Sequence, residues 1–245
     1  MSSEQHLALL LDAPLQSWGF ASRFQRRTTG LHPTKSGIVG LLAAALGVDK
    51  HSPLEADAVG ALARLRMTVV AIPKPSGALF AGSRTDALEV RRLADYHTVQ
   101  GTRLASGKID REGTVVTHRQ YLLDARFGVF LSAVSNWHLP DGRDLAAVAA
   151  ALRDPVWGVW FGRKCCIPAA PVLCGGLFTD AADGWRAILQ AVKLPEDLPL
   201  ENLTRIEEAL DFESGTDTFN DQPVTFSTPN THAPRRVRLK RGGES

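Results

Sequence analysis

The chain has 245 residues, of which 44% are hydrophobic and 22% are charged, and its formal net charge is +2. These totals are ordinary for a soluble globular protein. The longest apolar run, 38–48, is about half of the roughly 20 residues that a membrane-spanning helix needs, and no secretory signal pattern is present. Three cysteines, two of them adjacent, are too few for a disulfide framework. We therefore expect a reduced, cytoplasmic protein without a membrane span.

Apolar runs and helical spacing predict the elements in chain order. A nearly continuous apolar run near the N-terminus indicates a buried strand, and later β-branched runs indicate further strands. The first helix has Thr34 or Ser36 as its N-cap and Gly47 at its C-terminal cap. The expected elements are a strand at 6–11, a helix from 34–37 to Gly47, a helix at 54–65, strands at 66–73, 115–123 and 127–134, a helix at 144–153, a strand at 156–161 and a helix at 183–193.

This order of elements fits an α+β, ferredoxin-like domain, which we place at residues 1–175. A smaller region, 176–245, follows, and its stretch 214–234 is polar and turn-rich. The stretch 100–113 shows no period. If its flanks pair as strands, the middle projects as a hairpin or arm.

Basic residues are clustered although the net charge is small. Residues 13–48 contain four basic side chains and no acidic one, and 235–241 contain five more, whereas 180–221 is acidic. A local basic patch suits an anionic partner such as an RNA backbone. Solvated surface charge is the alternative interpretation.

The loop after the first strand contains Trp18, Arg23, Arg26 and Arg27. Arginine forks grip phosphates, and an indole face stacks on a base for about 1–3 kcal/mol. This composition favours a nucleic-acid contact. A core anchor under the loop is the alternative for the tryptophan.

Residues 30–37 resemble a phosphate loop, but Thr34 stands where the second glycine of that motif belongs, so an NTPase is rejected. A helix N-terminus that contains Lys35 and hydroxyl residues still favours an anion such as an RNA phosphate. Plain helix capping is the alternative.

Two further segments contain groups suited to chemistry on RNA. His97 and His118 flank the aperiodic stretch and could act as acid and base in metal-independent cleavage, although lone histidines are more often structural. Gly162 precedes two cations, Arg163 and Lys164. The cysteine spacing gives no zinc pattern, so no metal or other cofactor is expected.

The blocks LLLDAPLQSWG, HPTKSGIVGLLAAALG, DYHTV, HRQYLLDARF and FGRKCCIP, in this order, resemble the CasD subunit family of type I-E CRISPR Cascade complexes. The resemblance covers about the first 175 residues. It implies a ferredoxin-like (RRM-related) domain with a projecting thumb, here at about 95–120. It also implies a non-catalytic subunit that caps the crRNA at its 5′ handle, beside a backbone subunit and the large PAM-reading subunit. The resemblance leaves open whether target DNA lies within reach.

The family's motif positions, combined with side-chain chemistry, give the expected handle contacts. These are Trp18, Arg23, Arg26, Arg27, Thr34, Lys35, Ser36, Tyr96, His97, Arg103, Arg119, Arg163 and Lys164. Relatives in type I-C systems cleave precursor RNA with a lysine-and-histidine site that residues 117–119 resemble, but an arginine replaces the expected lysine. A metal-independent endoribonuclease is therefore the alternative function, and a purely protein-bridging subunit is a third.

Overall fold

The computed structural model describes residues 4–20, 25–74, 91–103 and 106–242. The elements are β1 (Gln5–Asp12), β2 (Leu15–Gln16), β3 (Arg26–Arg27), α1 (Lys35–Leu46), α2 (Glu55–Ala63), β4 (Arg66–Ala71), β5 (Arg91–Arg103), β6 (Ile109–Leu123), β7 (Arg126–Ala133), α3 (Leu145–Arg153), β8 (Leu173–Phe178), α4 (Ala181–Ala191), a 3₁₀ turn (Leu200–Asn202), β9 (Arg205–Glu208), β10 (Asp217–Thr225) and β11 (Thr231–Lys240).

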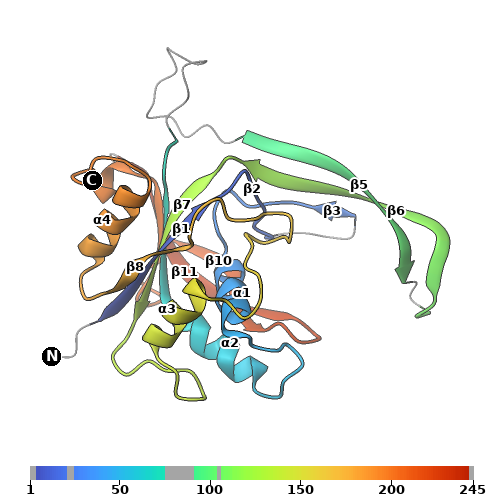
Figure 1. Ribbon diagram of the computed structural model, residues 1–245, viewed down its shortest axis with the longest axis horizontal. Coiled ribbons are helices and arrows are strands. Elements are labelled where there is room, and N and C mark those ends of the chain that lie inside the picture. Colours follow the sequence, from blue (N-terminus) through green and yellow to red (C-terminus); the bar gives the residue numbers. More distant parts are fainter. Residues whose placement is uncertain (1–3, 21–24, 75–90, 104–105, 243–245) are drawn as a thin grey trace, which may run out of the picture.

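A seven-stranded sheet forms the body, in the order β10-β11-β9-β4-β7-β1-β8, and every neighbouring pair in it is antiparallel. Helices cover both faces (Figure 1). Leu7, Leu9 and Leu11 of β1 pack with α1, α2 and α3, whereas Ala8 and Leu10 pack with α4. Because both faces of β1 are buried, its sequence is a nearly continuous apolar run rather than an alternating one.

In chain order, the first four strands of this sheet are β1, β4, β7 and β8, and they form one unit with α1, α2 and α3. Both β1 and β4 are antiparallel to β7, which lies between them, so β1 and β4 run in the same direction. Helices α1 and α2 connect β1 to β4, and α3 lies between β7 and β8 in the chain. Strand β9 then extends the sheet beyond β4, followed by β11 and β10. Residue 175, where we placed the domain boundary, lies inside β8.

The local signals for helices are confirmed. Thr34 is the N-cap of α1, and Gly47 ends this helix in the left-handed region at φ 72°. The helices expected at 54–65, 144–153 and 183–193 correspond to α2, α3 and α4 with shifted ends. Capping and periodicity therefore located every α-helix in the described part of the chain.

The strand expected at 156–161 is wrong, because the fourth strand of the unit is β8. The backbone N–H groups of Val156 and Trp157 instead donate to Ala45 and Ala44, at 2.9 and 3.2 Å, and so satisfy carbonyls at the C-terminal end of α1. Phe161 is fully buried and stacks against Trp18. Two backbone hydrogen bonds and the buried Phe161 ring thus hold this segment against the core as a loop, and it does not form a strand.

The stretch 214–234 is also different from our expectation, because most of it forms the β10–β11 hairpin. The buried positions of this hairpin include Asp221 on β10 and Arg235 on β11, whose side chains pair with each other at 2.6 Å. Since charged residues occupy positions that are normally apolar, the alternation typical of a strand was hidden in the sequence.

Strands β5 and β6 pair from Arg91↔Leu123 to Arg103↔Ile109 and extend away from the body (Figure 1). The short strands β2 and β3 lie along the other edge of β6 near its base. The pairing therefore continues through residues in which the sequence showed no period. Exposed positions such as Tyr96 and Ile109 explain this, because a two-stranded arm without a buried face needs no alternation.

Candidate functional site

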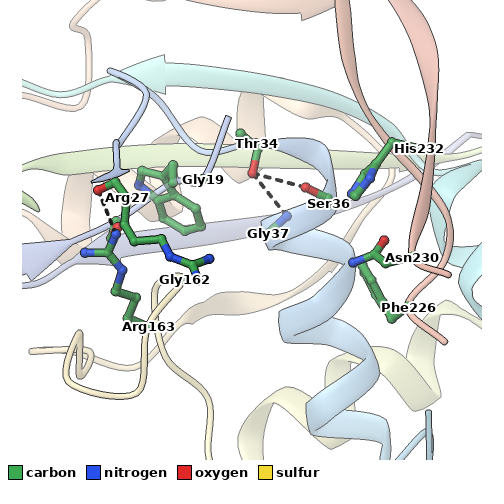
Figure 2. Close-up of a pocket in the computed structure, with 12 residues that line it drawn as sticks. Gly19, Arg27, Thr34, Ser36, Gly37, Gly162, Arg163, Phe226, Asn230 and His232 are labelled. Atoms are coloured by element: carbon green, nitrogen blue, oxygen red, sulfur yellow. Dashed lines mark hydrogen bonds between the residues drawn. The ribbon is translucent and has the colours of Figure 1, made fainter. Parts of the chain in front are cut away.

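A cavity of ≈ 280 Å³ opens at the N-terminus of α1. The loop at Gly162 and strand β3 form one wall, and the β10–β11 turn forms the other (Figure 2). Its lining residues come from five separate stretches of the chain: Ser17, Trp18, Gly19, Arg27, Thr34, Ser36, Gly37, Gly162, Arg163, Phe226, Asn230 and His232.

The floor of the cavity is the first turn of α1 packed on Trp18. The Thr34 hydroxyl accepts the Gly37 N–H at 3.2 Å, so Thr34 is occupied as a cap. A Cβ on Gly37 would lie 2.8 Å from an indole carbon, so only glycine permits this contact. Trp18 is fully buried, and its Nε1 donates to Gln16 at 3.0 Å. The prediction that Trp18 stacks on a base is therefore wrong, and it is a core anchor.

Lys35 is also buried, with 0% exposure. Its ammonium donates to the Leu65 carbonyl and to the Glu208 carboxylate, the latter at 2.5 Å. Burial lowers the pKa of Lys35, and the nearby Glu208 carboxylate opposes that shift. The prediction that Lys35 contacts an RNA phosphate is wrong, because its charge is neutralised inside the protein.

The anion expected at the N-terminus of α1 is supplied by the chain itself. The Lys35 N–H donates to Asp221 Oδ2 at 2.7 Å, and Arg235 binds both oxygens of the same carboxylate at 2.6 and 3.0 Å. Burial opposes ionisation, but the Arg235 guanidinium and the Lys35 N–H together hold the pKa of Asp221 below its ordinary value. The helix dipole therefore stabilises a carboxylate of β10 at the place predicted for phosphate.

Arginines of β3 join the base of the hairpin. Strand β3 pairs in parallel with β6, which places Arg26 beside His118 and Arg27 beside Arg119. Both arginines of β3 are exposed, and Arg119 is half-buried with its Nε donating to Thr117 at 3.2 Å. Two segments about 90 residues apart in sequence thus form one short basic ribbon at the cavity.

The pairing register assigns the hairpin side chains to two faces. Tyr96 pairs with His118 across β5 and β6, and their rings meet edge-on at 5.4 Å. His97 pairs with Thr117 and follows Tyr96 directly. Since successive strand residues point to opposite faces, His97 and His118 project in opposite directions. The acid–base pair suggested by the sequence is therefore not assembled.

Arg163 fastens the ribbon to the body. Its guanidinium donates to the carbonyls of Gln120 and Arg27, both at 3.0 Å, and lies 4.7 Å from the centre of the Tyr121 ring. The preceding Gly162 has φ 90°, and a Cβ there would overlap the Ser17 carbonyl oxygen. This close approach places the Arg163 charge beside Arg27 in the cavity wall (Figure 2).

The remaining predicted residues are distributed around this centre or lie outside it. Ser36 lines the cavity, and Lys164 is exposed with its ammonium 5.6 Å from the Trp160 ring centre. Arg23 and the side chain of Arg103 lie outside the described residues.

Sequence reasoning missed the wall contributed by Phe226, Asn230 and His232. The only sequence signal in that region was the basic stretch at 235–241, and the structure accounts for part of it internally. Arg235 is buried against Asp221, and Lys240 pairs with Glu207 at 3.1 Å. The residues of this segment that line the cavity, Phe226, Asn230 and His232, come just before that stretch.

Within the described ranges, no group of three histidine, cysteine or acidic side chains is arranged to hold a metal ion. No helix in the same ranges is long and apolar enough to cross a membrane.

Comparison with known proteins gives four related matches: one family, one named protein and two solved structures. Residues 6–238 match the family described as CRISPR-associated protein (Cas_Cas5). A protein of Escherichia coli (strain K12), named CRISPR system Cascade subunit CasD, is 28% identical over 239 residues, which are 97% of this chain and 96% of that protein. A chain in a solved CRISPR RNA-guided surveillance complex is 27% identical, with a TM-score of 0.65, over 97% of this chain and 90% of that one. A solved Cas protein is 30% identical, with a TM-score of 0.59, over 96% and 93% of the two chains.

Proposed function

Because the chain belongs to the family described as CRISPR-associated protein (Cas_Cas5), we propose that it is a subunit of a Cascade surveillance complex that holds the 5′ handle of the crRNA. The relatives support this role, since one is a Cascade subunit and another lies in an RNA-guided surveillance complex. In this role the chain contacts a backbone subunit and the large PAM-reading subunit, in the bacterial cytoplasm.

The strand order supports a ferredoxin-like (RRM-related) core within this proposal. The order β8-β1-β7-β4, with helices between β1 and β4 and between β7 and β8, is the arrangement of a βαββαβ unit. The projecting β5–β6 hairpin then corresponds to the family's thumb. We place the expected division, 1–175 and 176–245, a few residues later, at the end of β8, and the smaller region after it extends the sheet.

The observation that carries the function is that two arginines from distant segments line one cavity and a third lies beside one of them. Arg27 comes from β3, Arg119 from β6 and Arg163 from the loop after α3, and the pairing of β3 with β6 and the Arg163 hydrogen bonds join them. Exposed His232 adds a ring face on the opposite wall of the cavity, and exposed Tyr96 adds one beside His118 on the other face of the hairpin. Single-stranded RNA is held by this combination of phosphate neutralisation and stacking.

The proposed contact set follows from exposure. Trp18 and Lys35 leave the set, and Thr34 positions the floor as a helix cap. The proposed RNA contacts are Arg26, Arg27, Ser36, Tyr96, His97, Arg119, Arg163, Lys164, Phe226, Asn230 and His232. Arg23 and Arg103 stay in the proposal from sequence alone.

We propose that the chain does not cleave RNA. This part of the proposal is supported by the opposite orientations of His97 and His118, which prevent both imidazoles from acting on one phosphate. The test is incubation of purified protein with labelled repeat RNA in EDTA. Intact RNA is expected, whereas defined cleavage that His118→Ala abolishes would establish the endoribonuclease alternative.

The binding test uses two double variants with the same charge change. Arg27→Gln with Arg119→Gln removes a cavity cation and its neighbour on β6. Arg64→Gln with Arg186→Gln removes two exposed cations elsewhere, at the C-cap of α2 and on α4. At ~1 kcal/mol for each phosphate contact, the first variant should bind handle RNA about 30-fold more weakly, and the second should bind as wild type. Fluorescence anisotropy with handle RNA and a scrambled RNA measures both affinities. Equal losses in the two variants would contradict the proposed site.

A further inference from the structure

The loop 209–216, which joins β9 to β10, presents two large apolar side chains to solvent. Leu210 is 78% exposed and Phe212 is 69% exposed, although they are only two positions apart. Single exposed apolar residues are common on protein surfaces and need no explanation. A pair on one short loop suggests a role when the loop is also held rigidly.

Arginines of β11 hold this loop in one conformation. Arg236 donates to the carbonyls of Phe212, at 3.1 Å, and of Gly215, and its guanidinium lies 4.6 Å from the centre of the Phe212 ring. Arg238 donates to the Ser214 carbonyl. A pair of β11 residues therefore fixes the backbone that presents the two apolar side chains.

One hydrogen bond within the loop and one from the loop to β11 add to this order. The Asp211 carboxylate accepts the Ser214 N–H at 2.7 Å, and the Thr216 N–H donates to the Val237 carbonyl at 2.9 Å. Much of the ordering entropy of the loop is thus lost during folding rather than during association. An apolar anchor that is rigid before binding is what a strong protein–protein contact requires.

The charges around the loop indicate the kind of partner. Asp211, Glu213 and Asp217 are exposed and flank the two apolar side chains. Carboxylates repel RNA phosphates, so the loop is unsuited to the handle. They complement a basic rim on a protein surface.

The position of the loop separates it from the RNA cavity. Strand β10 begins at Asp217, next to the loop, and ends at Thr225, next to the cavity residue Phe226. At about 3.3 Å for each strand residue, the two sites lie roughly 25 Å apart along β10. Association at the loop can therefore proceed while RNA is bound.

We propose that the loop 209–216 is a docking knob for another protein subunit of the complex, whose surface has an apolar socket with a basic rim. This inference rests on the proposed function, because it takes the partner from the same Cascade assembly. Leu210 and Phe212 are the anchors, and Arg236 is a positioning residue that acts through the loop backbone.

The test compares Leu210→Ala with Phe212→Ala in one variant and Leu54→Ala with Val134→Ala in a control, since these two are exposed to a similar degree elsewhere. Incorporation into the reconstituted complex is measured by mass photometry, and handle-RNA affinity of each isolated variant by anisotropy. The loop variant should enter the complex about 30-fold more weakly, as expected for loss of interface anchors, with unchanged RNA affinity. The control should match wild type in both.

A crosslinking arm identifies the partner. With p-benzoylphenylalanine at position 212, irradiation of the complex should give a crosslink to a protein subunit. A crosslink to RNA, a parallel loss of RNA affinity, or unchanged assembly of the loop variant would overturn the docking proposal. Failure of the wild-type chain to enter the complex would instead refute the proposed function, and the docking partner with it.

Discussion

Replacing Lys35 by methionine tests the internal role of this residue. Methionine keeps most of the side-chain volume and removes the ammonium that binds Glu208 at 2.5 Å and the Leu65 carbonyl. The Lys35 side chain is 1% exposed and that of Glu208 is 14% exposed. Loss of one partner from a buried pair costs about 3–5 kcal/mol. We expect the lower end, ~3 kcal/mol, because Glu208 keeps the Met67 N–H at 2.9 Å and Arg235 at 3.8 Å.

The assay is thermal unfolding followed by circular dichroism. For a chain of this size, ~3 kcal/mol corresponds to a Tm lower by about 6–12 °C. Lys164→Met removes an exposed ammonium and should leave Tm unchanged. Adding Glu208→Gln to Lys35→Met should recover part of the loss, because the negative charge that lost its closest partner is then gone.

A Lys35→Met protein that melts within about 2 °C of wild type would refute this reasoning. The refutation would be complete if the same variant also bound handle RNA more weakly with a shallower salt dependence. Lys35 would then be the phosphate contact that its sequence context first indicated.

Three further predictions concern the loop at Gly162, the pH dependence of stability and the reactivity of the three thiols. Gly162→Ala should lower Tm and weaken RNA binding together, because φ is 90° and the added Cβ overlaps backbone; normal values of both would contradict the close approach. Burial lowers the pKa of His32 from its ordinary value of 6.5, so the unfolded chain binds more protons just below that pH and stability should fall as pH drops below about 6.5. Urea midpoints from pH 7.5 to 5.5 should show this fall in wild type and a smaller one in His32→Phe. Burial raises the pKa of the Cys166 thiol to about 12 and that of Cys174 to about 11, so mass spectrometry after iodoacetamide at pH 8 should find only Cys165 labelled; rapid labelling of either buried thiol in folded protein would contradict the packing.

Local rules predicted the parts of the fold that depend on neighbouring residues. The Thr34 cap, the Gly47 terminus and the apolar run of β1 all follow from contacts within a few positions. Element types were correct for the same reason, with the exception of 156–161. The aromatic composition of that segment predicted a strand. It forms a loop instead, because its backbone bonds the end of α1 and Phe161 stacks on the buried ring of Trp18.

The interior of the site could not be predicted from local pattern. Lys35 pairs with a glutamate 173 positions away, and its N–H binds Asp221, 186 positions away. A lysine at a helix N-terminus predicts a bound anion, but here the chain itself supplies that anion as Asp221. Strands β10 and β11 were not predicted for a similar reason. Their buried positions include the charged residues Asp221 and Arg235, which pair with each other across the hairpin.

The basic ribbon was predicted only as a set of unconnected residues. Arg26, Arg27, Arg119 and Arg163 were each selected for their chemistry, and the sequence contained no sign that β3 pairs with β6. The hairpin shows the opposite case. The segments on either side of 100–113 predicted a projecting hairpin, but not how far its strands pair. Neither face of the hairpin is buried enough to require alternating apolar and polar residues.

Photocrosslinking of handle RNA that contains 4-thiouridine, followed by peptide mass spectrometry, tests most directly where RNA lies. Adducts are expected around the cavity and at the base of the hairpin, at Tyr96, Phe226 and His232, with none on α4. Adducts confined to α4 or to the loop 209–216, in protein that binds the RNA fully, would show that the cavity lined by Arg27 and Arg163 does not bind the strand.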